Sequence, residues 1–384
     1  MHGVRQLGSA RTFYEECLDG AEALQAKGYN LDSGRLLAVY PFGHRNPFLR
    51  MLYASAFDHG FAVLPLKNLA QLDEVPPGLD VVVHHHWVHR IFDKLTSVSE
   101  AEKAVEAFLA TVEKQKRAGR PLVWTVHNVL SHRTPFPEQE VQLRASFAAL
   151  VDHIHIMNPK TPALCAPYYG LEESKLFRVP HPAYAGVYGD YVSREQARIT
   201  LGLQPADCVF LLFGELGPYK GTRHFLEQLD ALQDRMTGKA RIIIAGKEGD
   251  GAFMEDIFRL TSGRADVQLY LGHVDDQNVQ TFFRAADVAV CAHTAGLNSG
   301  VVATALTFGC PTVMASRMAH TVEGAEEFIF PFDATDMSTA VDACVAAYEL
   351  SRQPGLKPAM KGWAQKMAPG AISNRFFDAL RGQL

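Results

Sequence analysis

A glycine-rich turn is the first place in the sequence where the residue types and their spacing predict chemistry. Residues 213–221 read FGELGPYKG and carry Gly214, Gly217 and Lys220 between an apolar run and a helix-compatible segment. Glycines let a backbone approach a phosphate closely, and a lysine beside a helix N-terminus adds a full charge to the partial positive charge of the helix. The segment predicts a diphosphate site. The alternative is a plain strand-to-helix turn with a solvated lysine.

A second segment, residues 291–311 (CAHTAGLNSGVVATALTFGCP), predicts another anion site. Asn298, Ser299 and Gly300 precede a helix rich in small residues. A serine at this position caps the helix, and the first helical amides have no partner within the helix. Both segments are expected to leave the carboxyl ends of parallel strands, where open sheets of this class bind ligands. An ordinary capped core helix is the alternative.

The elements that must position these segments follow an alternation of short apolar runs and amphipathic stretches, which predicts an α/β fold with mostly parallel sheets. In the first half the expected strands are 35–41, 61–66, 79–85, 122–126, 153–157 and 176–179, and the expected helices are 48–59, 100–118 and 138–150. In the second half the expected strands are 208–213, 240–245, 267–271, 288–291 and 312–314. The first 34 residues give the weakest pattern.

The chain is expected to form two domains and a terminal helix. Its 384 residues exceed what one hydrophobic core usually serves. The periodicity stops in residues 180–191, where proline, glycine and tyrosine replace it. We therefore expect domains over 1–184 and 185–370, and a helix over 371–384 that packs back on the first domain.

The composition is that of an ordinary globular protein, with 47% apolar and 21% charged residues. A net charge of -5 gives no basic field for a phosphate backbone, so nucleic acid is not an expected partner. The six cysteines show no CxxC spacing and are expected to be reduced core residues of a cytoplasmic protein. No apolar run approaches the length of a membrane span, and peripheral attachment to the inner face of a membrane stays open.

These segments together resemble the GT-B glycosyltransferases, and most of all the GDP-mannose-dependent β-mannosyltransferases of xanthan-type polysaccharide assembly. The resemblance rests on FGELGPYKG and the NSG-to-GCP helix, on WTVHN at 124–128, on His85-His86-Trp87, and on Asn46-Pro47-Phe48 with Leu52-Tyr53. It implies two Rossmann-like domains with parallel sheets facing across a cleft. The first would receive a glycan or lipid-linked glycan, and the second would hold the nucleotide sugar.

The resemblance also implies a role for individual residues. The implied donor-binding residues are Gly214, Lys220, Gly246, His273, Asn298, Ser299 and Gly300. The implied acceptor-side residues are His44, Asn46, Trp87 and Asn128. Lys220 would neutralise the diphosphate, so no metal and no other cofactor would be required.

One departure from the GT-B pattern concerns stereochemistry. Many retaining GT-B enzymes carry two glutamates eight residues apart around the second segment, and the equivalent positions here are Gly296 and Thr304. The missing pair agrees with inversion, which the mannosyltransferase resemblance implies. A retaining transferase using another nucleotide sugar such as UDP-glucose, an epimerase on the same fold and a catalytically silent nucleotide-sugar-binding protein stay open as alternatives.

An inverting transfer needs a base that takes the proton of the acceptor. His127, at the end of an expected strand, is the first candidate, followed by His89, Asp93, His132 and Glu138. A histidine titrates near neutral pH, yet a histidine at a strand end can equally be a structural donor. Alternate residues of the run His84-His85-His86 share a face of their strand, but no matched carboxylates or cysteines at ligand spacing accompany them, so a metal site is not expected.

Overall fold

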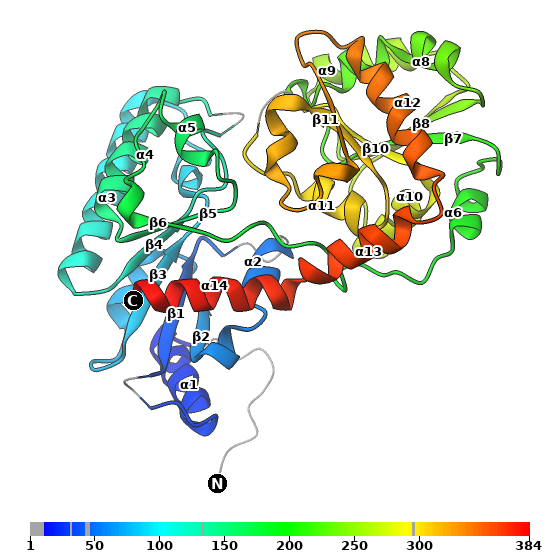
Figure 1. Ribbon diagram of the computed structural model, residues 1–384. Coiled ribbons are helices and arrows are strands. Elements are labelled where there is room, and N and C mark those ends of the chain that lie inside the picture. The colour runs from blue at the N-terminus through cyan, green and yellow to red at the C-terminus, as the bar shows by residue number, and fades with distance from the viewer. Residues whose placement is uncertain (1–10, 31–32, 43–46, 132–133, 294–295) are drawn as a thin grey trace. The chain divides into compact units, whose positions relative to one another are not determined.

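The computed structural model describes residues 11–30, 33–42, 47–131, 134–293 and 296–384. The chain divides into two compact units, Met1–Val179 together with Ser373–Leu384, and Pro180–Ile372 (Figure 1). Each unit is a parallel sheet covered by helices, so the expected α/β class is confirmed. Within the described residues, no helix has the length and apolar character needed to cross a membrane.

The first unit contains a six-stranded sheet in the order β2-β1-β3-β4-β5-β6, and every pair is parallel. Its strands are β1 (Arg35–Tyr40), β2 (Phe61–Pro65), β3 (Val81–His85), β4 (Leu122–Thr125), β5 (His153–Ile156) and β6 (Leu176–Arg178). Its helices are α1 (Phe13–Ala26), α2 (Pro47–Leu52), α3 (Val98–Arg117), α4 (Pro137–Leu150), α5 (Thr161–Cys165) and, from the end of the chain, α14 (Pro369–Gln383).

The expected helix over 48–59 is wrong in its middle. It ends at Leu52, and a separate 3-10 turn follows at Ala56–His59. The carbonyl of Leu52 accepts a hydrogen bond from the hydroxyl of Ser373 in α14 (2.7 Å), and that hydroxyl accepts one from the amide of Ser55 (2.9 Å). These contacts take the backbone groups that a continuous helix would need.

Helix α14 packs on one face of the first sheet. Its residues Ile372, Phe376, Phe377 and Leu380 are fully buried, as their helical spacing predicts. The ring of Phe376 stacks on His84 of β3 with centroids 5.5 Å apart, and Phe377 contacts Phe61 of β2. The last residues of the chain therefore complete the core of the unit formed by the first ones.

The second unit has the strand order β12-β11-β10-β7-β8-β9, again with parallel pairs throughout. Its strands are β7 (Cys208–Phe213), β8 (Ala240–Gly246), β9 (Val267–Leu271), β10 (Val288–Cys291), β11 (Thr312–Ala315) and β12 (Ile329–Phe332). Its helices are α6 (Arg194–Thr200), α7 (Thr222–Leu226), α8 (Leu229–Arg235), α9 (Gly251–Thr261), α10 (Asp276–Ala285), α11 (Gly300–Thr307), α12 (Thr339–Ser351) and α13 (Leu356–Lys366).

Alternating side chains of β7 fill two separate cores. Phe210 and Leu212 join the cluster that contains α7, α8, α9 and α12. Val209 and Leu211 point to the opposite face and join the cluster that contains α6, α10 and α11. A strand buried on both faces reads as a continuous apolar run, which is why its bounds were predictable.

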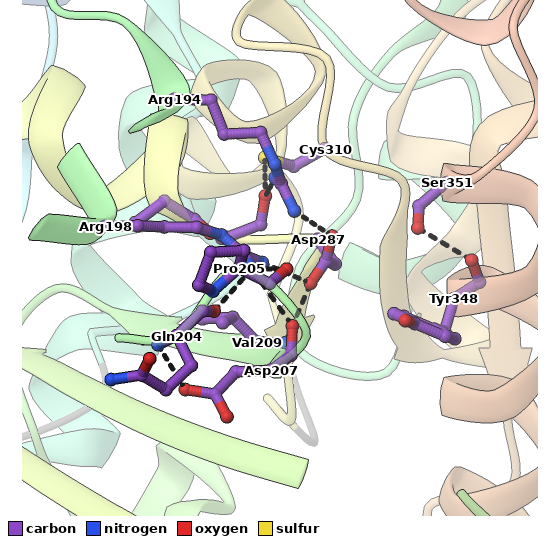
Figure 2. Close-up of polar contacts among 12 residues, drawn as sticks. Arg194, Arg198, Gln204, Pro205, Asp207, Val209, Asp287, Cys310, Tyr348 and Ser351 are labelled. Atoms are coloured by element: carbon purple, nitrogen blue, oxygen red, sulfur yellow. Dashed lines mark hydrogen bonds and ion pairs between the residues drawn. The ribbon is translucent and has the colours of Figure 1, made fainter. Parts of the chain in front are cut away.

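A buried network of charged and polar groups holds the amino-terminal ends of strands β7 and β10 in this second sheet (Figure 2). The carboxylate of Asp287 accepts hydrogen bonds from Arg198 (2.8 Å) and from the amide of Val209 (2.8 Å). The same Arg198 donates to the carbonyls of Gln204, Pro205 and Asp207. Because these amino-terminal strand ends are fixed, the sequence of the loops at the carboxyl-terminal strand ends can vary while the sheet is kept.

Candidate functional site

The strand order of the second unit places the two predicted anion segments next to each other. Strand β7 pairs with β8 on one side and with β10 on the other, so the order reverses between β7 and β10. The loop after β7 and the loop after β10 both leave from carboxyl-terminal strand ends at this point. Open α/β sheets bind their ligands at such a switch point. We call residues 214–221, 292–293 and 296–299 the paired loops, since residues 294 and 295 lie outside the described part.

Glycines make the first of the paired loops. Gly214 (φ 105°) and Gly221 (φ 67°) adopt backbone conformations that other residues rarely take. A Cβ on Gly221 would lie 2.1 Å from the carbonyl oxygen of Ala292, in the other loop. Gly246 (φ 151°), at the end of β8, lies under the first loop, and a Cβ there would be 1.9 Å from the carbonyl oxygen of Gly214. The glycine pattern therefore reflects tight packing between loops as well as access for a ligand.

Lys220 is half-buried at the end of the 3-10 turn Pro218–Lys220. Burial lowers the pKa of its ammonium, and the neighbouring Cys291 and Glu215 oppose that change. Its Nζ lies 5.1 Å from the ring centroid of Tyr219. A cation in a partly desolvated position interacts more strongly with an anion than one in bulk water does.

Ser299 caps α11 as predicted. Its Oγ accepts a hydrogen bond from the amide of Val302 (3.4 Å) and lies 3.9 Å from the Sγ of Cys291. Gly300 is the first residue of α11, and a Cβ on it would lie 2.6 Å from the hydroxyl of Tyr184. Asn298 is half-buried directly before the cap. The start of α11 thus brings a serine hydroxyl, helix amides and a tyrosine hydroxyl together beside the first loop.

The positions that would carry the glutamate pair of retaining enzymes hold no carboxylate. Gly296 has φ 158°, and a Cβ on it would lie 3.0 Å from the Cε of Met318. Thr304 is buried, and its hydroxyl donates to the carbonyl of Gly300 within α11 (2.7 Å). The Thr304 hydroxyl is therefore engaged within its own helix.

His273 follows β9, two strands away from the switch point. Its side chain is exposed, and the amide of the preceding Gly272 donates to the carbonyl of Gly246 (3.0 Å). This backbone contact connects the ends of β8 and β9, where Gly246 and His273 were expected to bind the donor.

In the first unit, a continuous series of hydrogen bonds runs across the carboxyl-terminal ends of β3, β4 and β5. We call it the histidine chain, and its members in order are Val179 (carbonyl), His155, Thr125, His84, Tyr53, His86 and His127. The successive distances are 2.9, 3.0, 2.7, 2.8, 2.6 and 2.9 Å. His84, His86 and His155 are buried, whereas His127 is half-buried at the end of the series.

His127 is held between aromatic rings. Trp87 stacks on it with centroids 4.3 Å apart and an interplanar angle of 17°, and Phe48 meets it edge-on at 5.0 Å. Trp87 and His127 were both expected in the site, and the structure brings them into contact. The next residue, Asn128, accepts a hydrogen bond from Arg144 through its carbonyl (3.0 Å).

A buried ion pair fixes the loop that follows His127. Arg144 and Glu140, one turn apart on α4, lie 2.8 Å apart, and their side chains are 3% and 0% exposed. The same Glu140 oxygen accepts from the amide of Ser131 (2.8 Å), while Arg144 reaches Asn128. Both ends of the loop 128–131 are therefore tied to one helix.

The other candidates for the base lie in different surroundings. His89 is half-buried, and burial lowers its pKa, with Arg144 as the next contribution. Asp93 is exposed and pairs with Arg90 at 3.1 Å, and Glu138 is exposed in the first turn of α4. His132, His44 and Asn46 lie outside the described residues.

The three consecutive histidines divide between the two faces of β3. The rings of His84 and His86 lie 4.3 Å apart on one face, while His85 points to the other face against Phe108 and Phe147. This alternation was predicted from the strand. Over the described ranges, no group of three or more histidine, cysteine, aspartate or glutamate side chains is arranged to hold a metal ion.

Several residues that build these sites were not expected from the sequence. They are Thr125, Glu140, Arg144, His155 and Tyr184. Glu140 and Arg144 show the four-residue spacing of an ion pair on a helix, which was a readable signal. The others come together only through the sheet.

Comparisons with known proteins point in one direction. Residues 207–347 match the family described as glycosyl transferases group 1. No curated protein matches the sequence at a significant level. Among solved structures, Anabaena Alr3699/HepE in complex with UDP-glucose is similar at a TM-score of 0.61 and 15% identity over 98% of each chain.

Two further structures extend this similarity. Sucrose-phosphate synthase from Thermosynechococcus elongatus matches at a TM-score of 0.63 and 13% identity, over 91% of this chain and 98% of that one. A glycosyltransferase from Rickettsia africae matches at 0.62 and 10% identity, over 92% and 99%. The chain has the GT-B fold, and residues 207–347 of its second unit match the glycosyl transferases group 1 family.

Proposed function

We propose that this protein transfers a hexose from a nucleotide sugar to a hydroxyl of a glycan or lipid-linked glycan. The observation that carries the proposal is the meeting of the paired loops at the switch point of the second sheet, with Lys220 on one loop and the Ser299 cap on the other. A lysine and a helix start on adjacent loops suit a diphosphate whose charge grows as it leaves. The group 1 glycosyltransferase match lies over the same loops.

The donor that we propose is GDP-mannose, and the stereochemical outcome is inversion. The acceptor oxygen would attack the anomeric carbon, the bond to the diphosphate would break with its electron pair leaving on the phosphate, and His127 would take the acceptor proton. The absence of carboxylates at Gly296 and Thr304 supports inversion over a retaining mechanism in which a glutamate pair binds the sugar and the ribose. The second unit supplies donor binding, and the first supplies the base.

The donor is tested with a thermal-shift panel of GDP-mannose, GDP-glucose, UDP-glucose and ADP-glucose. A ligand that binds the folded protein alone raises its melting temperature by mass action. We expect the GDP sugars, and GDP-mannose above all, to give the largest shift. A larger shift with UDP-glucose would replace the proposed donor with the one bound by Anabaena HepE.

The reaction is tested by the anomeric signal of the product in proton NMR. An α-linked nucleotide sugar should give a β-linked product if transfer inverts. An α-linked product would remove both the inverting mechanism and His127 as its base. A protein that binds the donor but neither transfers nor hydrolyses it would instead be a silent binding protein.

A further inference from the structure

We propose that the histidine chain sets the tautomer of His127, so that in the neutral ring Nε2 carries the hydrogen and Nδ1 carries the lone pair. The inference rests on the proposed function only where it assigns that lone pair to the acceptor proton. The other members of the histidine chain are positioning residues, because they act through His127.

The donor-to-acceptor direction of the histidine chain is set at its buried end, the carbonyl of Val179. The carbonyl of Val179 can only accept a hydrogen bond, so Nε2 of His155, at 2.9 Å, must donate to it. In a neutral His155 the other nitrogen, Nδ1, must then accept. Its partner is the hydroxyl of Thr125 at 3.0 Å, which therefore donates.

Every later hydrogen bond must have the same donor-to-acceptor direction, because each hydroxyl has a single hydrogen to donate. With its hydrogen directed to His155, the Thr125 oxygen accepts from Nε2 of His84 at 2.7 Å. Nδ1 of His84 accepts from the hydroxyl of Tyr53 at 2.8 Å, and the Tyr53 oxygen accepts from Nε2 of His86 at 2.6 Å. The remaining nitrogen of His86, Nδ1, accepts at 2.9 Å from Nε2 of His127.

The three inner rings are neutral, because His84, His86 and His155 are fully buried and burial disfavours a charged imidazole. Burial holds the pKa of His84 and of His86 well below the ordinary value for histidine, and neighbouring histidines lower both further. The ring of His84 is also stacked on Phe376 at an interplanar angle of 6°, which opposes a ring flip.

The histidine chain does not conduct a proton away from His127. Its far end is a carbonyl, which does not take a proton, and His84, His86 and His155 have almost no exposure to solvent. A proton taken up by His127 must therefore leave through the half-buried ring itself. The network orients a base and leaves proton exchange to its exposed end.

Thr125→Val gives the sharpest test. Valine keeps the shape of threonine and removes the hydroxyl. In the native direction, Nε2–H of His84 would then be a buried donor without an acceptor. In the reversed direction only lone pairs, those of His84 Nε2 and His155 Nδ1, would face the valine methyl groups. An unmet buried N–H is costly, so we expect the direction to reverse and His127 to carry its hydrogen on Nδ1. Thr125→Ser keeps the hydroxyl and is the matched control.

The measurement is the ¹⁵N shift pattern of histidine-labelled protein, which distinguishes the two tautomers, with the His127 signal identified through His127→Gln. We expect the Nε2–H form in the wild type and in Thr125→Ser, and the Nδ1–H form in Thr125→Val. With GDP-mannose as donor, kcat should fall by about 10²-fold or more in Thr125→Val, with KM for the donor unchanged.

An Nδ1–H tautomer in the wild-type protein would overturn the proposal without any variant. An unchanged tautomer in folded Thr125→Val would overturn it as well. If the tautomer reverses and kcat stays at the wild-type value, the control of the tautomer stands and the assignment of the lone pair to the acceptor proton falls. Failure of the proposed function would leave the ¹⁵N result unaffected.

Discussion

Gly221 and Ala292 pack so closely that the two loops around the switch point form one structure. A Cβ at Gly221 would lie 2.1 Å from the carbonyl oxygen of Ala292, and φ at Gly221 is 67°. A left-handed conformation costs a non-glycine residue about 1–2 kcal/mol, and the clash adds to this cost. We expect Gly221→Ala to lower the free energy of unfolding by more than about 2 kcal/mol and to weaken donor binding.

Gly263→Ala is the matched control for this prediction. Gly263 has φ 72°, and a Cβ on it would have nothing within 4 Å, so this variant measures the cost of the backbone conformation alone. Urea denaturation gives both values. Equal losses in the two variants would mean that the contact between the loops adds nothing to stability.

Lys220→Ala should weaken donor binding with little effect on the fold. A hydrogen bond to a charged group contributes about 1.5–3 kcal/mol, so the Kd for GDP-mannose should rise by about 10-fold to 100-fold in calorimetry. Lys239→Ala is the control, because Lys239 is exposed directly before β8, at the amino-terminal ends of the strands and away from the paired loops. An unaltered Kd in Lys220→Ala would remove the diphosphate assignment.

The lowered pKa of Lys220 predicts opposite effects of pH on binding and on stability. As the pH rises from neutral toward the ordinary lysine pKa of about 10.4, Lys220 of the free protein loses its charge first, and donor affinity should fall. In the same window the unfolded chain holds more protons than the folded one, so the contribution of Lys220 to the free energy of unfolding rises with pH.

Lys220→Arg separates this effect from other titrations, because arginine keeps its charge throughout the window. Calorimetry across the pH range should show an affinity decline in the wild type that is absent or much smaller in Lys220→Arg. Parallel declines in the two proteins would assign the pH effect to another group.

His127→Ala should lower kcat by about 10²–10⁴-fold, the usual contribution of a general base, while the Kd of the donor stays within about twofold. His224→Ala, which alters an exposed histidine of α7, should leave turnover unchanged. Normal turnover in His127→Ala would direct attention to His89, Asp93, His132 and Glu138.

Arg144→Met should destabilise the protein through the carboxylate that it leaves behind. Glu140 is fully buried, and removing one partner of a buried ion pair costs about 3–5 kcal/mol. Arg117→Met is the control, since Arg117 pairs with Glu113 at the surface, where such a pair contributes about 0.5 kcal/mol or less. A loss as small as that of the control would mean that the Glu140 carboxylate finds another partner.

The sequence allowed the fold and the paired loops to be predicted because both depend on local patterns. Strand β7 is an unbroken apolar run, and the loop after it is marked by its own glycines. Strand β12 escaped prediction because Pro331 interrupts it, which an edge strand tolerates and a central strand does not. Helix α1 escaped although Thr12 and Glu15 form a capping box at its start.

The histidine chain could not be predicted, since its order depends on strand pairing. Tyr53, Thr125 and His155 are separated by long stretches of sequence, and none has a neighbour that marks it as part of a network. The register that sets His84 opposite Val123, and Val123 opposite His153, arises from the whole sheet. The place of His127 at a strand end makes it a candidate base, but it does not indicate what orients its ring.

The packing of α14 on the first sheet has a consequence for synthesis on the ribosome. Residues 373–384 belong to the same compact unit as residues 1–179, yet they are translated after the whole of residues 180–372. At translation rates of about 5–20 residues per second, the face of β3 that meets Phe376 would wait about 15–60 seconds for its cover. During that interval the second unit can fold completely while the first still exposes apolar surface, so chaperones have their longest opportunity to bind the unit whose sequence was translated first.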